Sequence, residues 1–161
     1  MEIREVGSQD LEKLTELIIR VYRDTRISMW FDFEPTQKEL EGLFNYKIKS
    51  VGSGKSVDLV AVEQGRILGE CEILLTEQGG IVGIIIEKAH RRKGIGIELF
   101  EAGAKRACKA GVKIVFADVA KENAAAMRFF KKLGFKMSAA QPAAGIGIDD
   151  GQAPIRLELM L

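Results

Sequence analysis

The stretch from Glu87 to Phe100 reads EKAHRRKGIGIELF and joins two segments of different pattern. Before it, residues 81–86 are a nearly continuous run of isoleucine and valine, typical of a strand covered on both faces. After it, apolar and small residues recur at helical spacing until Gly111, a residue that commonly ends a helix. The stretch therefore predicts a strand-to-helix turn, and its three basic residues and two glycines raise the question of an anion site.

Three kinds of phosphate-binding loop compete for this chain. A dinucleotide-binding turn needs Gly-x-Gly-x-x-Gly, but Leu99 stands in the third glycine position. A nucleotide-triphosphate loop would end at Gly54-Lys55-Ser56, yet Lys49 stands where its first glycine belongs and no apolar strand precedes it. The third pattern, Arg91-x-x-Gly94-x-Gly96 between a buried strand and a helix, fits the sequence.

In that pattern the glycines allow a tight turn and a close approach of the backbone to an anion. The amides of residues 92–97 then converge at a helix N-terminus, where the helix dipole favours a phosphate or pyrophosphate. Arg91, Arg92 and Lys93 could add charge-assisted contacts. Taken alone, a Gly-x-Gly turn is more often a plain connection with solvated basic neighbours.

Periodicity predicts the other elements of the chain, and together they form a mixed sheet with helices on both faces. Ser8 is expected to cap the first helix, the capping box Thr36 to Glu39 the second, and Asn123 the last. The expected strands are residues 3–6, 57–62, 67–75, 81–86, 112–119, 135–139 and 155–161.

Length and composition suit one domain spanning residues 1–161 with a full core. The net charge of +1 gives no global support for a nucleic-acid partner. No apolar run is long enough to span a membrane, and the first residues lack the pattern of a signal peptide, so a cytoplasmic location is expected. Cys71 and Cys108 are expected to be buried, reduced thiols, and no metal cluster is expected.

The turn and a second motif further along carry a resemblance. Arg91-x-x-Gly94-x-Gly96 followed by Asn123-Ala-Ala-Ala-Met-Arg-Phe-Phe-Lys-Lys-Leu-Gly-Phe135 resembles the GNAT superfamily of acetyl-CoA-dependent N-acetyltransferases. The resemblance implies an α+β fold of three layers (αβα). Its central sheet would be mixed but mostly antiparallel, with six to seven strands, and strands 4 and 5 would splay apart.

The resemblance also implies where acetyl-CoA binds as cosubstrate, without a metal. The turn would hold the pyrophosphate, and the strand before it would carry a bulge and offer backbone groups to the acetyl end. Asn123 would lie near the cofactor, although a plain helix cap explains it equally well. The implied cofactor contacts are Ile84, Ile85, Ile86, Arg91, Arg92, Lys93, Gly94, Ile95, Gly96, Ile97, Asn123 and Phe130.

Phe130 departs from the family pattern. The family usually has a tyrosine there, which protonates the departing thiolate, whereas a phenyl ring has no proton to give and serves as core or cofactor packing. A thiol of pKa ~8.5 leaves as thiolate only ~2 kcal/mol uphill at pH 7. A transferase without this acid is therefore still expected to work, more slowly.

The resemblance leaves the general base open. Asp118 is near the position where acetyltransferases of ribosomal-protein N-termini have a glutamate base, and a polar strand end explains it equally well. Glu70 and Glu72, on one face of a strand, are alternative bases unless they belong to a solvated face. The need for a base depends on the acceptor, because an α-amine is ~10–20% neutral at pH 7 and a lysine only ~1 in 2,500.

The expected reaction is direct transfer of an acetyl group to an amine, on a peptide N-terminus or on a small molecule. The aromatic segment 29–34 would border the acceptor unless it only packs under a loop, and the pair Asp149 and Asp150 could face the same opening. The resemblance is compatible with a homodimer. A non-catalytic acyl-CoA-binding sensor is the rival suggested by Phe130, and a nucleic-acid module is a weaker one.

Overall fold

The computed structural model describes residues 1–25, 33–142 and 154–161. Residues 29–32 of the aromatic segment and the pair Asp149 and Asp150 lie outside these ranges. The order of elements is β1 (Glu2–Glu5), a 3₁₀ turn (Ser8–Asp10), α1 (Leu11–Thr25), α2 (Gln37–Gly52), β2 (Ser56–Glu63), β3 (Arg66–Thr76), β4 (Gly79–Ile86), a 3₁₀ turn (Lys88–His90), α3 (Ile95–Lys109), β5 (Ile114–Val119), α4 (Ala124–Lys132), β6 (Lys136–Met137) and β7 (Ile155–Met160).

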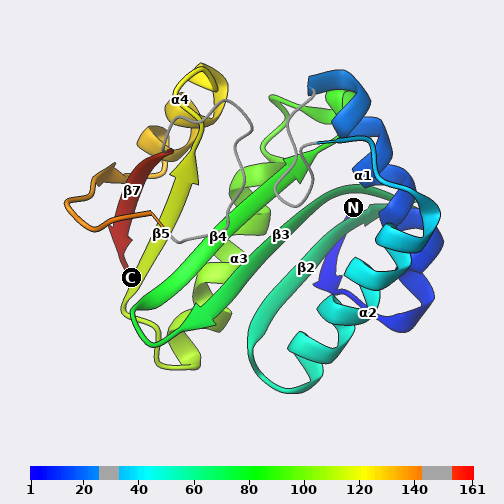
Figure 1. Ribbon diagram of the computed structural model, residues 1–161, viewed down its shortest axis with the longest axis horizontal. Helices are drawn as coiled ribbons and strands as arrows, with labels where there is room; N and C mark the ends of the chain where they lie inside the picture. The colour runs from blue at the N-terminus through cyan, green and yellow to red at the C-terminus, as the bar shows by residue number, and fades with distance from the viewer. Residues whose placement is uncertain (26–32, 143–153) are drawn as a thin grey trace.

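The strands form one seven-stranded sheet in the order β1-β2-β3-β4-β5-β7-β6 (Figure 1). Every neighbouring pair is antiparallel except β4 and β5. These two strands run parallel and are connected along the chain through α3. The prediction of a mixed, mostly antiparallel sheet of six to seven strands is confirmed.

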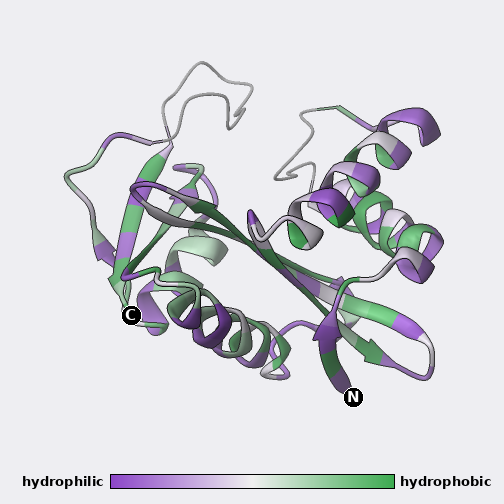
Figure 2. Cartoon of the chain, turned by 90° about the horizontal axis from the view of Figure 1, so that it is seen from below, coloured by the Kyte–Doolittle hydropathy of each residue, from purple (hydrophilic) through white to green (hydrophobic). Residues whose placement is uncertain are grey.

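Helices cover both faces of this sheet, as predicted. In Figure 1, α1 and α2 lie against one face and α3 against the other. One buried cluster joins α1 and α2 to the sheet through Leu17 and Phe44, and a second joins α3 and α4 through Leu99 and Phe130. Figure 2 shows hydrophobic and hydrophilic residues alternating around these helices, which is the pattern expected of helices packed on one side.

Side-chain caps begin two of the helices as predicted. The Thr36 hydroxyl accepts from the Glu39 amide and the Glu39 carboxylate accepts from the Thr36 amide at 2.8 Å. Asn123 Oδ1 accepts from the amide of Ala126 at 3.0 Å. The prediction for Ser8 is wrong, because the chain makes a 3₁₀ turn there and Asp10 bonds back to the Gly7 amide at 2.9 Å.

Two details of the strands and thiols differ from expectation. The register of β3 on β4 runs without interruption, so the bulge implied for the strand before the turn is absent, and a register shift lies instead between β2 and β3 at Ala61 and Val62. Both cysteines are free, as predicted, but Cys108 is exposed on α3 rather than buried. Within the described ranges, every helix is too short or too polar to cross a membrane.

Candidate functional site

The turn between β4 and α3 presents a row of backbone amides. Gly94 is the N-cap of α3 with φ of 90°, and Arg92 also has a positive φ, of 65°. Among the described residues, the amides of 92–96 have no intramolecular acceptor. The Ile97 amide is the first to be used, donating to the Gly94 carbonyl at 2.9 Å. Five of the six predicted amide donors are therefore unpaired at a helix N-terminus, the arrangement that binds phosphates.

The two glycines of this turn do different work. A Cβ on Gly94 would lie 3.7 Å from Glu98 Oε1, an ordinary contact distance, so what requires glycine there is the positive φ. A Cβ on Gly96 would lie 3.2 Å from the ring of Phe129 and 3.6 Å from Ile86. Gly96 thus lets α3 pack closely against α4 and β4, a role that the sequence analysis did not assign to it.

Beside this turn, β4 and β5 separate. They are paired only at Gly80 with Val115 and at Ile81 with Phe116, although both strands continue beyond these pairs. Figure 1 shows the two ribbons diverging in this direction. The predicted splay of strands 4 and 5 is confirmed.

The backbone of β4 shows which groups face this gap. The Glu87 amide donates to Leu68 of β3 at 2.9 Å, so across a trans peptide bond the Ile86 carbonyl points away from β3, toward the gap. Because this direction alternates along a strand, the backbone groups of Ile84 also face the gap, whereas those of Ile85 face β3. Of the three residues predicted to offer backbone groups to the acetyl end, Ile84 and Ile86 face the gap and Ile85 does not.

Arg91, beside the gap, is already engaged by other residues. Its Nε donates to the Ile86 carbonyl at 2.9 Å, and its Nη1 lies 2.8 Å from Asp24 of α1. Lys88 also reaches Asp24, at 2.7 Å, and these two cations lower the pKa of Asp24, Lys88 contributing first through its hydrogen bond. Arg92 and Lys93, in contrast, are exposed beside the amides. They are the better placed of the three basic residues to meet an anion.

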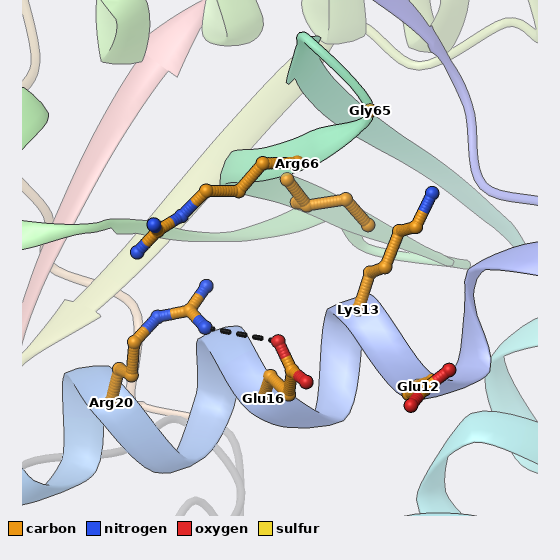
Figure 3. Close-up of a pocket in the computed structure, with 7 residues that line it drawn as sticks. Glu12, Lys13, Glu16, Arg20, Gly65 and Arg66 are labelled. Atoms are coloured by element: carbon orange, nitrogen blue, oxygen red, sulfur yellow. Dashed lines mark hydrogen bonds and ion pairs between the residues drawn. The ribbon is translucent and has the colours of Figure 1, made fainter.

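Glu87 ties the same turn to the rest of the molecule. It is buried and pairs with Arg20 of α1 at 3.1 Å, with Arg66 of β3 and with His90 Nδ1 at 3.1 Å. A surface hollow of about 290 Å³ lies between α1 and the β2–β3 turn. Figure 3 shows Arg20 and Arg66 among the residues that line it. None of the predicted site residues lines it, so we do not assign the acceptor to this hollow.

Phe130 lies inside the protein. Its ring is buried and meets Phe129 and Phe135 in edge-to-face contacts with centroids 5.2 and 5.1 Å apart. The prediction that Phe130 packs in the core is confirmed.

Asp118 lies on the face of the sheet opposite to α3, where it forms an ion pair with Arg156 of β7. The two carboxylate oxygens accept from Arg156 at 2.7 and 2.6 Å, and both side chains are almost fully buried. The guanidinium also lies 4.7 Å from the centroid of the Phe116 ring. The pairing of Asp118 with Arg156 was not predicted, because the two residues are 38 positions apart in the chain.

Glu70 and Glu72 belong to a buried cluster that sequence reasoning also missed. The Nζ atom of Lys47 in α2 lies 2.6 Å from Glu72, 2.9 Å from Glu70 and 3.1 Å from Asp58 of β2. All four side chains are at most 2% exposed, so the alternative of a solvated face is wrong. Lys47 follows Leu40 and Phe44 by seven and three residues, so its place on the apolar face of α2 could have been noticed.

Charge is unbalanced in this cluster, with three carboxyl groups around one ammonium. Burial raises the pKa of Asp58 and of Glu70, because an ionised carboxylate loses its hydration there. Burial alone would lower the pKa of Lys47, but the negative charges of its partners outweigh it and raise the pKa. The lysine thus stays charged, and burial favours the neutral form of Asp58 and of Glu70.

The splayed pair β4 and β5 thus leaves an opening beside a turn whose amides can bind an anion. A sequence profile described as the acetyltransferase (GNAT) family matches residues 16–135, which is most of the chain. The chain belongs to the GNAT family of acetyltransferases.

Individual relatives agree with this membership. An uncharacterized N-acetyltransferase of Methanocaldococcus jannaschii is 29% identical over 142 residues, 83% of this chain and 60% of that relative, so the chain spans about three fifths of its length. A ribosomal-protein-alanine N-acetyltransferase structure from Brucella melitensis has a TM-score of 0.80 at 18% identity, covering 100% of both chains. The PaiA N-acetyltransferase of Thermoplasma acidophilum, in complex with coenzyme A, has a TM-score of 0.77 at 20% identity, covering 99% of this chain and 98% of the other. At these identities the structures establish the fold.

Proposed function

We propose that this chain is an N-acetyltransferase that moves an acetyl group from acetyl-CoA directly to an amine. The observation that carries the proposal is the row of unpaired amides of residues 92–96 at the start of α3, beside the open gap between β4 and β5. These amides would hold the pyrophosphate, with Arg92 and Lys93 adding positive charge. Family membership and the coenzyme A complex of the PaiA relative support this cofactor.

The gap would receive the acyl end of the cofactor. The Ile84 amide faces it and could stabilise the negative charge that develops on the thioester oxygen. Direct transfer is favoured because no described residue is an activated nucleophile. Cys71 is fully buried, and burial raises the pKa of its thiol, so it stays unreactive.

The acceptor in this proposal is an amine, carried by a peptide or by a small molecule. A homodimer and a cytoplasmic location stay predictions. An acyl-CoA sensor without transferase activity is the second candidate, favoured by the absence of a proton donor at Phe130. Release of free thiol from acetyl-CoA in the presence of a panel of amines separates the two, because a sensor binds the cofactor without releasing thiol.

Substitution at Gly94 tests the cofactor turn, and Gly111 offers a matched control. The two glycines bound the same helix, with φ of 90° and 93°, and no atom within 3.4 Å would crowd a side chain at either. Gly94→Val should therefore strain the backbone about as much as Gly111→Val while moving the amides only at the turn. We expect Gly94→Val to raise the Kd for coenzyme A at least about tenfold, measured by calorimetry.

The control should leave this Kd within about twofold, a difference of under ~0.5 kcal/mol. Equal affinities for the two folded variants would remove the pyrophosphate from this turn.

A further inference from the structure

Two side chains near the end of α1 reach the segment between β4 and α3. Arg20 and Asp24 are four residues apart and therefore lie on one face of the helix. Arg20 pairs with Glu87 at 3.1 Å, and Asp24 pairs with Lys88 at 2.7 Å and with Arg91 at 2.8 Å. The charges on the helix face and on the segment are thus complementary, and Figure 1 shows the end of α1 beside the end of β4.

Asp24 is in an unfavourable place for the helix itself. It lies in the last turn of α1, which ends at Thr25, and the free carbonyls of a last turn disfavour a negative charge. Its side chain is only 16% exposed, and each oxygen faces one cation, Oδ1 the ammonium of Lys88 and Oδ2 the Nη1 atom of Arg91. This carboxylate does not stabilise its own helix, so we look for its role in the two cations that it holds.

Arg91 extends the contact from α1 to the gap. Its Nε donates to the Ile86 carbonyl at 2.9 Å, and this carbonyl faces the gap between β4 and β5. The amide of the same peptide unit, that of Glu87, donates to Leu68 at 2.9 Å, so the carbonyl is held from both sides. A guanidinium is planar with fixed nitrogen spacing, so holding Nε and Nη1 also fixes the direction of Nη2, which has no acceptor among the described residues. Arg91 therefore presents an oriented, unused donor where the gap meets the turn.

We propose that Asp24 is a positioning residue of the cofactor site, which holds the Arg91 guanidinium where the gap meets the turn so that it binds the pantetheine arm of coenzyme A. This inference rests on the proposed function, because the arm joins the acyl group in the gap to the diphosphate at the amides of residues 92–96 and has to pass this point. The arm carries amide carbonyls and a hydroxyl group, which are acceptors for a guanidinium donor. Asp24 acts through Arg91 and needs no contact of its own with the cofactor.

Charge alone predicts a different effect of Asp24. It is negative and belongs to the surroundings of the proposed diphosphate site, so removing its charge should strengthen the binding of any diphosphate. Loss of positioning should instead weaken only ligands that carry the pantetheine arm. Dephospho-coenzyme A and ADP share the adenosine diphosphate group and differ in this arm, so the ratio of their Kd values isolates the contribution of the arm.

Calorimetry gives both Kd values for the wild type and for variants of Asp24. In Asp24→Asn we expect the Kd for dephospho-coenzyme A to rise about tenfold, the effect of losing one hydrogen bond to a charged group, while the Kd for ADP stays within about twofold or falls. Asp24→Glu retains a carboxylate and should recover part of the loss. Glu16→Gln removes the same charge from an exposed ion pair of α1 with Arg20, and it should leave both Kd values within about twofold.

Arg91→Lys tests whether Asp24 acts through this arginine. Lysine keeps the positive charge but lacks the fork of nitrogens with which Arg91 spans Asp24 and the Ile86 carbonyl. It should raise the Kd for dephospho-coenzyme A about as much as Asp24→Asn does. The double variant should bind about as weakly as either single variant, because the two residues act as one unit. Arg91→Lys also provides the test if urea unfolding shows that Asp24→Asn does not fold.

A Kd ratio in Asp24→Asn equal to that of the wild type, whether both ligands bind more weakly or more tightly, would overturn the inference. Additive losses in the double variant would overturn it too, because the two residues would then act separately. Equal binding of the two ligands to the wild type would exclude a contact with the arm and leave the diphosphate at the turn. A wild type that binds neither ligand would overturn the proposed function as well, so the two failures are distinguishable.

Discussion

In the proposed reaction, Phe130 offers no proton to the departing sulfur of the cofactor. Without a proton donor, the thiolate departs uncompensated, which costs about 2 kcal/mol at pH 7 for a thiol of pKa ~8.5. The ring contributes instead to the aromatic cluster that joins α4 to α3 and to Phe135. At this residue the chain has a packing side chain where the resemblance implies an acid.

Phe130→Tyr should restore part of the missing function. A hydroxyl reaching the gap could protonate the thiolate, and we expect kcat to rise by up to about 10²-fold, since general acids are worth ~10²–10⁴-fold. Steady-state thiol release measures this. Phe129→Tyr places the same hydroxyl on the neighbouring, half-buried ring and should leave kcat unchanged. A folded Phe130→Tyr protein with unchanged kcat would show that thiolate departure does not limit the reaction.

Single residues of the site were predictable where backbone conformation decides their identity. Gly94 is required by its positive φ, and the motif made this visible in the sequence. Gly96 depends on the approach of Phe129 from α4, and Asp118 on Arg156 from β7. Such contacts between distant segments leave no local signal, so their roles could not be predicted.

At the scale of elements, α2 packs on the sheet around a buried cluster of charged side chains. Lys47 projects from the apolar face of α2 onto β2 and β3, where Asp58, Glu70 and Glu72 surround its ammonium. Neither Glu70 oxygen makes a well-oriented hydrogen bond, although one lies 2.9 Å from the lysine. Glu70 therefore lowers the stability of the protein at a pH at which its carboxyl group is ionised in the unfolded chain.

Glu70→Gln should stabilise the protein at neutral pH. The raised pKa of Glu70 means that the folded state retains a proton which the unfolded chain releases above about pH 4.5. The wild type thus loses stability as pH rises from there toward the folded pKa, and glutamine removes this loss. We expect a gain of about 1 kcal/mol or more at pH 8 and none at pH 4, measured by urea unfolding.

Lys47→Met should have the opposite effect and lower the stability of the protein. It leaves the carboxyl groups without their cation and should cost about 3–5 kcal/mol at pH 8. Lys49→Met, on the exposed side of the same helix, should change stability little. A loss of stability in Glu70→Gln at pH 8 would show that the cluster needs all three carboxylates.

Elements themselves were largely predictable from periodicity and caps. The capping box of Thr36 and the side-chain cap of Asn123 were readable because donor and acceptor are three residues apart. The hydrogen bond from the Gly7 amide to Asp10 was not predicted, because the ion pair of Asp10 with Arg4 of β1 joins two separate elements. The divergence of β4 from β5 depends on pairing across the sheet, so only the resemblance to a known family predicted it.

At the scale of the whole molecule, the cofactor turn is joined to both layers of helices. It begins α3 on one face, while Asp24 of α1 binds Lys88 and Arg91, and Arg20 of α1 binds Glu87. The end of α1 therefore borders the turn. This places the unpaired amides, the gap and the end of α1 around one region of the sheet.

A crystal structure of the protein with acetyl-CoA tests this arrangement most directly. The account predicts the diphosphate within hydrogen-bonding distance of the amides of residues 92–96, with the acetyl group between β4 and β5 at the level of Ile84 and Ile86. A cofactor bound elsewhere, with these amides facing only water, would contradict it.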